Sequence, residues 1–512
     1  MVLFVRAQQT KTTRRTAGLL LACSLAATVA VVAPAIASQP ARAATPATVT
    51  TAAATPLTAT LTWKHEMGNA GHPVALASPM VATLGSGGSS VVIGDRSGHE
   101  SAFHLSNGGL VFKVATPGGA AVDSTPSVMG SGTSARLFFG EGTSSSPAVG
   151  GYRSISSTGH QVWLVKPKAQ PSGSATRGVM SSLAIGNLQT GNDVIGGSMG
   201  QEQDLMAATN GKVESGFPWF QADSNFSTPA VTDPNSTPGK DLIVEGGDST
   251  AGVAFGTHYA NGGHIRLLYR TGNAGSSNPA AGLKCQYNTN QVVQSSPAVG
   301  NFLTSSAWGA VVGTGTYWSG ASDTDKLIAI NSTCQPIWKA SLSGSTQSSP
   351  ALADTSGTGH NSVIEGTLMN ANAGRVYSLN GANGHTNWWT QIPGGVFGGI
   401  TTADLSGQGY QDVIVPTPTG TYILDGKTGR QIMKLGAGFG FQNSALVTND
   451  PNGTIGITLA GYDGHDAGII LHYEITGGGA RGANVNVKGA WPMFHHDQKL
   501  TGDANTVLAA KP

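Results

Sequence analysis

Residues 349–391 read SPALADTSGTGHNSVIEGTLMNANAGRVYSLNGANGHTNWWTQ, and they hold four short candidate strands separated by turns. Small apolar, β-branched and aromatic residues gather at 349–353, 362–366, 375–379 and 386–391, as is typical of strands. Gly, Asn and Ser dominate the segments between them, and Asn-Gly occurs twice, at 380–381 and 383–384. Asn-Gly is a strong signal for a tight hairpin. The stretch is therefore predicted to form one four-stranded antiparallel sheet.

The opening of this stretch recurs along the chain. A Ser/Thr-Pro-like pair is followed by small apolar residues, a turn and a β-branched run that ends near Gly, and the second residues of the pairs stand at 79, 126, 183, 229, 297, 350, 400 and 444. A period of roughly 50 residues with four strands in each repeat is the signature of a β-propeller. We therefore predict an all-β propeller of eight four-stranded blades over residues 61–502. Seven blades is the second choice, and separate β-sandwiches are the alternative fold, although the repeats are short for it.

The two ends of the repeat array suggest how the ring closes. Leu61-Thr-Trp63-Lys64 resembles Pro336-Ile-Trp338-Lys339, which is the last strand of a repeat, whereas the eighth repeat has three clear strands and ends near 469–475. We predict that the N-terminal strand completes the eighth blade, because open strand edges promote aggregation. The rival prediction is that residues 484–492 supply this strand.

Aromatic residues recur in the last strand of several repeats, as at Phe112, Trp163, Trp338 and Trp388. We expect each large apolar ring to cover the hairpin of the next blade. The alternative is that one of them stacks on a cofactor.

The composition excludes several classes of protein. Of 512 residues, 73 are Gly and only 11% are charged, which does not suit helical bundles, and the net charge of +1 gives no indication of a nucleic-acid partner. The hydrophobic fraction of 39% supports a packed core, so we expect a folded protein, and a monomer.

The N-terminus resembles a targeting segment. Arg6, Lys11, Arg14 and Arg15 precede an apolar stretch over 17–37, and Ala41-Arg42-Ala43 gives a small-residue cleavage pattern. We predict a signal peptide at 1–43, an Ala/Thr/Pro-rich linker at 44–60 and a flexible tail at 503–512; an uncleaved membrane anchor is the alternative. No later segment is long and apolar enough to span a bilayer. The mature chain is thus expected to be secreted or to lie at the cell surface, with no transmembrane domain.

Two cysteines, Cys285 and Cys334, remain once this segment is removed. They precede Pro297 and Pro350 by similar numbers of residues, which places them at comparable heights on neighbouring blades. Because an exported compartment permits disulfides, we predict a Cys285–Cys334 bond.

The repeats resemble two known families. SSPALADTSGTGHNSVIEG and TTADLSGQGYQDVIVP resemble the FG-GAP/VCBS repeat of integrin-like propellers, and YSLNGANGHTNWW and YILDGKTGRQIM resemble the PQQ-like repeat of quinoprotein-type propellers. Near the C-terminus, WPMFHHD at 491–497 resembles a W-P-M-F-x-H-D segment found beside such propellers in secreted bacterial proteins. The resemblance implies a propeller over residues 61–502 and leaves the function open.

FG-GAP repeats commonly carry an Asp-rich calcium loop, and the best copy here is Asp404, Ser406, Gln408 and Asp412. Calcium prefers six to eight oxygen ligands, and this copy keeps only two carboxylates. The alternative is a hairpin loop in which Asp caps backbone N–H groups. His495, His496 and Asp497 are not expected to share a metal ion, because adjacent residues of a strand point to opposite faces.

The quinoprotein resemblance would imply pyrroloquinoline quinone (PQQ), calcium, a catalytic Asp and usually a vicinal Cys pair. The sequence has no Cys-Cys and no acidic residue in a recognisable family motif, so PQQ is not expected. A glycan-active enzyme would need paired carboxylates, which sequence alone cannot pair across blades. These two enzymes are the alternatives to the favoured function, an exported binding or scaffold protein that engages a protein or a glycan through its loop faces.

The candidate binding loops are the long insertions near 166–179 and 271–294. Loop aromatics, such as Tyr317 and Trp318 or Trp219 and Phe220, are candidates for stacking on sugar rings or gripping a partner. Packing in the core is the favoured interpretation for each of them.

Overall fold

The computed structural model describes residues 56–143, 149–168, 177–221, 224–234, 242–254, 257–276, 280–370 and 372–508, without the side chains of 247–261. The described residues all belong to the second of the two units into which the chain divides, Ala53–Pro512. The predicted signal peptide and most of the predicted linker lie outside the described residues. Among those residues, no helix is long and apolar enough to cross a membrane.

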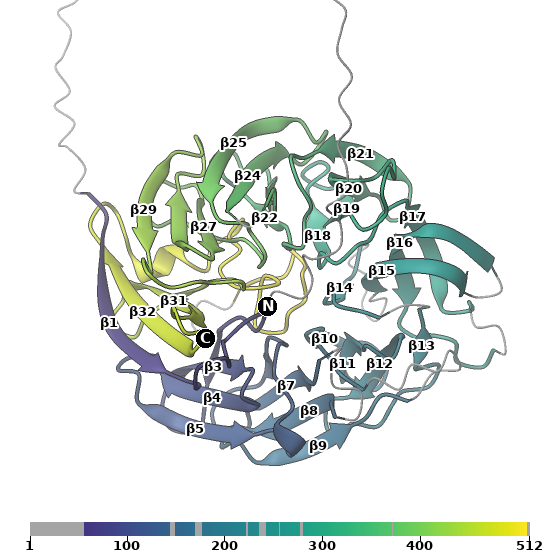
Figure 1. The fold of residues 1–512 in the computed structure, drawn as a ribbon, viewed down its shortest axis with the longest axis horizontal. Helices are drawn as coiled ribbons and strands as arrows, with labels where there is room; N and C mark the ends of the chain where they lie inside the picture. Colours follow the sequence, from purple (N-terminus) through teal and green to yellow (C-terminus); the bar gives the residue numbers. More distant parts are fainter. Residues whose placement is uncertain are drawn as a thin grey trace, which may run out of the picture. The chain divides into compact units, whose positions relative to one another are not determined.

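Eight four-stranded sheets stand around a ring in the second unit (Figure 1), and neighbouring strands within each sheet are antiparallel. The first four blades are β2 (Met80–Thr83), β3 (Ser89–Asp95), β4 (His99–His104), β5 (Leu110–Ala115); β6 (Ser127–Met129), β7 (Arg136–Glu141), β8 (Gly151–Ser156), β9 (Gln161–Val165); β10 (Ala184–Asn187), β11 (Asn192–Gly197), β12 (Glu202–Ala207), β13 (Trp219–Phe220); and β14 (Ala230–Thr232), β15 (Leu242–Ala254), β16 (Thr257–Tyr269), β17 (Leu283–Thr289).

The last four blades are β18 (Ala298–Asn301), β19 (Trp308–Gly313), β20 (Lys326–Ile330), β21 (Pro336–Ser341); β22 (Ala351–Ala353), β23 (Ser362–Gly366), β24 (Ala373–Asn380), β25 (Thr386–Pro393); β26 (Thr401–Ala403), β27 (Asp412–Thr417), β28 (Gly420–Leu424), β29 (Gln431–Leu435); and β30 (Leu446–Asn449), β31 (Ile455–Tyr462), β32 (Gly468–Thr476) with β1 (Thr58–Glu66). Two short 3-10 turns, Pro117–Gly119 and Gly482–Asn484, accompany them. The prediction of an all-β, eight-bladed propeller is confirmed.

The ring closes through the N-terminal strand. β1 pairs antiparallel with β32, from Thr58 opposite Thr476 to Glu66 opposite Ile469, and so forms the outer strand of the eighth blade. This confirms the predicted closure. The rival prediction is wrong, because part of 484–492 bonds to an inner strand instead: Trp491 forms a bridge with Thr402.

The recurring Ser/Thr of the repeat openings forms a hydrogen-bonded ring where the inner strands begin. The N–H of Ser78 donates to Thr125 Oγ1 (2.9 Å), the N–H of Ser444 donates to Ser78 Oγ (3.0 Å), and the series of such bonds runs from Ser444 through Ser78 to Ser349. The hydroxyl ring, as we name it, consists of Ser78, Thr125, Ser182, Thr228, Ser296, Ser349 and Ser444. Only the seventh blade lacks a hydroxyl, because Gly399 stands in that place. The end of the propeller that carries this ring is called the hydroxyl face below.

The C-terminal segment, residues 489–504, crosses the opposite ends of the inner strands (Figure 1, yellow). It touches every blade by hydrogen bonds to Val81, Val128, Ile185, Val231, Val299, Asp354, Thr402 and Val447. One segment therefore ties the eight blades together at this end.

Tryptophans of the outer strands pack on the next blade. The indole N–H of Trp338 donates to Gly381 O (2.8 Å), and the ring covers Gly384, whose φ is +71°. A Cβ at Gly384 would lie 2.6 Å from the ring, so only glycine fits beneath it. The same contact joins Trp63 to Gly108, Trp163 to Gly211 and Trp388 to Gly429. The expected packing of outer-strand Trp on neighbouring hairpins is confirmed.

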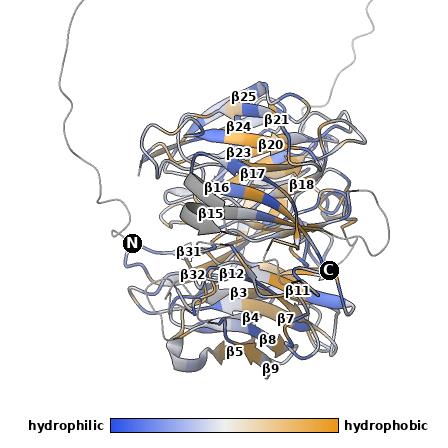
Figure 2. Ribbon diagram, turned by 90° about the vertical axis from the view of Figure 1, so that its right-hand side faces the viewer, coloured by the Kyte–Doolittle hydropathy of each residue, from blue (hydrophilic) through white to orange (hydrophobic). Residues whose placement is uncertain are grey.

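The hydrophobic core lies between adjacent blades rather than at one centre. Each inner and second strand buries nearly all its residues, whereas outer strands such as β21 alternate between buried and exposed ones. Figure 2 shows hydrophobic (orange) residues within the strands, next to hydrophilic (blue) ones.

Candidate functional site

On the hydroxyl face, the loop of residues 314–325 joins β19 to β20 in the fifth blade. The N–H of Thr346, three residues before the hydroxyl-ring residue Ser349, donates to Thr314 O (3.1 Å), which places the loop at this end. The fourth blade reaches the loop through residues 290–292, just after β17. The candidate site is therefore built at the boundary between two blades.

Gln291 forms hydrogen bonds with two residues of the loop. This fully buried side chain donates from Nε2 to Trp318 O (2.8 Å) and Thr324 Oγ1 (3.1 Å), while its Oε1 accepts from the N–H of Trp318 (2.9 Å). A buried amide whose donors and acceptor are all satisfied specifies one geometry, because any rearrangement leaves a polar group unpaired.

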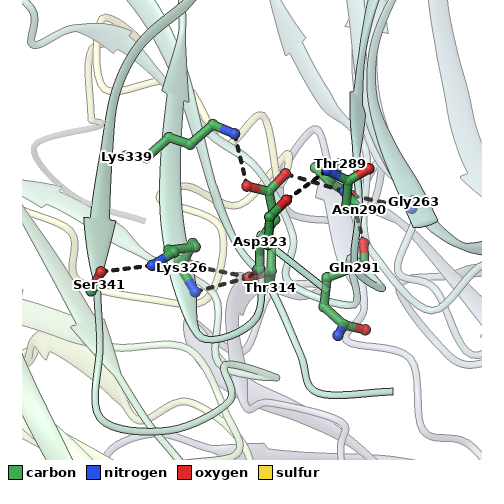
Figure 3. Close-up of polar contacts among 10 residues, drawn as sticks. Gly263, Thr289, Asn290, Gln291, Thr314, Asp323, Lys326, Lys339 and Ser341 are labelled. Atoms are coloured by element: carbon green, nitrogen blue, oxygen red, sulfur yellow. Dashed lines mark hydrogen bonds and ion pairs between the residues drawn. The ribbon is translucent and has the colours of Figure 1, made fainter. Parts of the chain in front are cut away.

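Asp323 fixes the other end of the loop (Figure 3). Its carboxylate accepts from the Asn290 N–H (3.1 Å) and from Lys339 Nζ (2.7 Å), which lies on the outer strand β21. Burial alone would lower the pKa of Lys339, but the hydrogen bonds and charge interactions with Asp323 and Tyr287 together outweigh it, and the pKa is raised. The nearby Lys326 Nζ donates to Ser341 Oγ (2.7 Å), so both lysines of this region are tied to neighbours.

The loop presents aromatic surface. Tyr317 is 70% exposed, and its ring meets that of Trp318 edge-on at 4.7 Å between centroids. Tyr317 therefore lies at the surface, as the binding interpretation of the loop aromatics requires. The other candidate pair behaves differently: Trp219 is fully buried under Arg266, whose guanidinium lies 5.3 Å from the ring, which agrees with the core-packing interpretation.

The two predicted binding loops are only partly described, and one of them contributes its last residues to the candidate site. Much of 166–179 lies outside the described residues. In 271–294, residues 271–276 and 280–282 join β16 to β17 at the end opposite the hydroxyl face, 283–289 form β17, and only 290–294 reach the site.

A disulfide lies beside the site. The Cys285 and Cys334 sulfur atoms are 2.17 Å apart, with Cα atoms at 5.8 Å, and join the fourth and fifth blades. Cys285 pairs with Leu267 of the neighbouring strand, next to a register shift between the two strands. Trp338 and Trp388 occupy the same place in their own blades, because they pair with Ala329 and Ser378 next to a register shift. Cys334 has φ +60° in the hairpin, much as Gly384 has φ +71° in the next blade. The disulfide thus occupies the place of a Trp–Gly contact.

The predicted calcium loop is engaged in internal hydrogen bonds. Asp404 accepts from the N–H groups of Gln408 (2.9 Å) and Gly409 (2.8 Å), and Ser406 Oγ donates to Asp412 (3.1 Å). Burial, with smaller contributions from Asp425 and Asp404, raises the pKa of Asp412 to about 7. In the described part of the chain, no group of three or more His, Cys, Asp or Glu side chains is placed to hold a metal. These bonds fit the capping alternative, and calcium at Asp404, Ser406, Gln408 and Asp412 stays a prediction.

The histidines of the C-terminal segment serve packing. His495 lies with Nδ1 2.6 Å from Leu500 O and Nε2 3.0 Å from Pro297 O, and burial lowers its pKa to about 4. His496 packs its ring 4.9 Å from that of Trp491. Both residues have positive φ, so they lie in a turn and not on the strand that the sequence argument assumed.

One arrangement missed by sequence reasoning resembles a catalytic triad. Thr458 Oγ1 lies 2.9 Å from His472 Nδ1, and His472 Nε2 lies 3.0 Å from Asp450 Oδ2. All three side chains are buried, and the Trp63 ring stacks on His472 at 5.0 Å. No substrate reaches them in this arrangement, so they form a structural network that anchors β1. Sequence offered no signal, because the three residues come from different strands.

Acidic side chains are also buried between blades. Glu245 pairs with Arg266 (3.2 Å) with both side chains fully buried. Burial raises the pKa of Glu141 to about 7 and that of Asp204 to about 7, and burial with the nearby Asp204 raises that of Glu202 to about 8. The sequence analysis could not pair these residues, because their partners lie on other strands or blades.

Comparisons with known proteins establish the class of fold. No protein-family model matches this sequence, and no curated protein sequence matches it significantly. Among solved structures, the quinohemoprotein alcohol dehydrogenase ADHIIG from Pseudomonas putida HK5 is similar with TM-score 0.52 and 12% identity, covering 81% of this chain and 76% of that one. Saccharomyces cerevisiae Sqt1 gives TM-score 0.52 and 10% identity, covering 80% and 99%, and the C-terminal WD40 domain of Sif2 gives 0.51 and 11%, covering 82% and 99%. The chain is thus a β-propeller, and at these identities the likeness shows the fold alone.

Proposed function

We propose that this protein is an exported binding or scaffold propeller that engages a protein or a glycan through the loops of its hydroxyl face. The observation that carries the proposal is the loop 314–325. Buried Gln291 and Asp323 hold it in one conformation, yet it presents Tyr317 70% exposed. A rigid, exposed aromatic residue is typical of binding sites, because little conformational entropy is lost when it is covered.

Export is supported by two features. The N-terminus combines basic residues with an apolar stretch and a small-residue cleavage pattern. The Cys285–Cys334 disulfide requires an oxidising compartment to persist.

The experiment compares the two ends of the propeller. Ser319→Cys places a thiol on the exposed loop of the hydroxyl face, and Thr358→Cys places one on an exposed loop at the opposite end. Each mature protein is coupled to a 5-kDa polyethylene glycol maleimide, with ~5 kDa chosen to cover a site of standard interface size. The immobilised proteins are then used to capture material from the cell surface of the producing organism.

We expect the polymer at Ser319→Cys to abolish capture and the polymer at Thr358→Cys to leave it intact. Equal capture by both conjugates would contradict binding through the hydroxyl face. The same preparations are assayed with added quinone and calcium for dye-linked oxidation of alcohols and sugars, and turnover there would replace the binding function with a dehydrogenase.

A further inference from the structure

We infer that the surface formed by Tyr317, Ser319, Ser322 and Asn290 is a binding site for a neutral saccharide. This inference rests on the proposed binding function and names the ligand class and the residues. Both blades of the boundary contribute, since Asn290 follows β17 and the other three residues lie in the loop between β19 and β20.

The aromatic part of this surface suits a sugar ring. One face of a pyranose presents C–H groups, which pack on the face of an aromatic ring. The edge contact with Trp318 fixes the orientation of the Tyr317 ring, while 70% of the residue remains exposed. The ring is therefore already positioned as a platform before any ligand arrives.

The polar part of the surface consists of amides and hydroxyls. The exposed Asn290 donates from Nδ2 to Ser322 Oγ (2.7 Å), and Ser319 is also exposed two residues from Tyr317. Neutral amides and hydroxyls both donate and accept hydrogen bonds, as sugar hydroxyls do. A saccharide on Tyr317 would meet matching groups beside the ring.

The charges around the surface favour a neutral ligand. Asp323 is buried and bonded to Lys339 and Asn290, and Lys326 is bonded to Ser341 (Figure 3). Asp325, also at the base of the loop, interacts with the charge of Lys326, as Asp323 does with that of Lys339. The two carboxylates and two ammonium groups thus offset one another, and the exposed groups that we name carry no charge. Anionic polysaccharides and lipid headgroups would gain little attraction here.

The test is affinity electrophoresis in native gels that contain dextran, xylan, galactomannan or starch, with polygalacturonate as the anionic comparison. Tyr317→Ala is the test variant. Trp389→Ala is the matched control, because Trp389 is a 51% exposed aromatic on the outer strand β25, away from the loop. Tyr317→Trp tests rescue by another ring, and equal thermal melting of the variants excludes misfolding.

We expect at least one neutral polysaccharide to retard the wild type. Tyr317→Ala should raise the dissociation constant by about 10-fold, the size typical of one aromatic contact, and Tyr317→Trp should restore binding. Trp389→Ala should behave like the wild type. Polygalacturonate should cause no retardation beyond that of a gel without polysaccharide.

Several results would overturn the inference. These are no retardation by any neutral polysaccharide, retardation that Tyr317→Ala leaves unchanged, or a preference for polygalacturonate. If the polymer at Ser319→Cys still blocks capture of a protein while no saccharide binds, the saccharide assignment fails and the binding function stands. If neither the polymer nor the substitution has an effect, both fail.

Discussion

Two neighbouring boundaries in this propeller solve the same packing problem with different chemistry. Between the fifth and sixth blades, the Trp338 indole covers Gly384 and donates to Gly381 O. Between the fourth and fifth blades, the corresponding places hold Cys285 and Cys334, joined as a disulfide. The repeat therefore specifies a position where blades must be joined, and either a large apolar contact or a covalent bond satisfies it.

The difference also bears on function. The disulfide lies at the boundary where residues 290–292 hold the loop 314–325. A covalent bond fixes the two blades relative to each other without depending on the shape of the hairpin surface. The boundary that carries the candidate binding site is thus the one joined covalently.

The largest expected effect is at the Trp–Gly boundary. Trp338→Ala removes a buried indole and its hydrogen bond, and we expect it to lower the free energy of unfolding by about 3–5 kcal/mol. Denaturant unfolding of the mature protein measures this, with the exposed Trp389→Ala as the control that should change little. A loss below about 1 kcal/mol, the size of a surface substitution, would show that the contact is not a major joint.

Loss of the disulfide is expected to have the second-largest effect on the free energy of unfolding. Cys285→Ala with Cys334→Ala opens a crosslink across a sequence separation of 49 residues, and we expect a loss of about 2–4 kcal/mol, mainly through greater freedom of the unfolded chain. The native, mature protein should show no thiol that reacts with maleimide. Two reactive thiols in protein from an oxidising compartment would show that the disulfide does not form, and the comparison of the two boundaries would then fail.

The network beneath β1 should contribute somewhat less. His472→Ala leaves the buried Asp450 without its histidine partner and removes the ring on which Trp63 stacks, so we expect a loss of about 2–3 kcal/mol. The exposed His465→Ala is the matched control and should be near neutral. If His472→Ala matched this control in thermal melting, β1 would be held by strand pairing alone.

The smallest effect concerns pH. Folded Glu141 and Asp204 have pKa values raised to about 7, and Glu202 has one raised to about 8, so between about pH 4.5 and pH 8 these three carboxyl groups bind more protons in the folded chain than in the unfolded one. The stabilisation that these three carboxyl groups provide is complete when the pH is below their pKa in the unfolded chain. It is lost as the pH rises through their pKa values in the folded chain. The melting temperature should therefore fall from pH 5 to pH 8, and Glu202→Gln should reduce the slope. A wild-type melting temperature that rises over this range would contradict the burial of these acids.

The sequence predicted those features that repeat or that pair adjacent segments. The blade count, the strand pattern around Asn380–Gly384 and the closure by residues 61–64 follow from local motifs, and so does the packing of Trp338 on the next hairpin. The sequence did not predict features that join residues remote in the chain. The Ser/Thr of each opening was recognised as a repeat, but its bond to the next blade was not.

The candidate site shows the same difference between local features, which the sequence predicted, and contacts between remote residues, which it did not. Tyr317 was identified as an exposed loop aromatic, whereas Gln291, which holds that loop, carries no local sequence signal. Core packing was the favoured interpretation for Trp219, but its contact with Arg266 of the next blade carries no local sequence signal. Cys285 was matched to Cys334 because the two residues were predicted at comparable heights on neighbouring blades. Recognising that this pair stands in the place of Trp and Gly required the strand register.

The most direct test of the equivalence of the two boundaries is to exchange their chemistry. Cys285→Trp with Cys334→Gly rebuilds a Trp–Gly pair between the fourth and fifth blades, and Cys285→Ala with Cys334→Gly is its baseline. The account predicts that the Trp–Gly protein exceeds this baseline by about 2 kcal/mol or more in the free energy of unfolding, since a covered indole buries large apolar area. A Trp–Gly protein no more stable than the baseline would contradict the claim that the disulfide occupies the place of that contact.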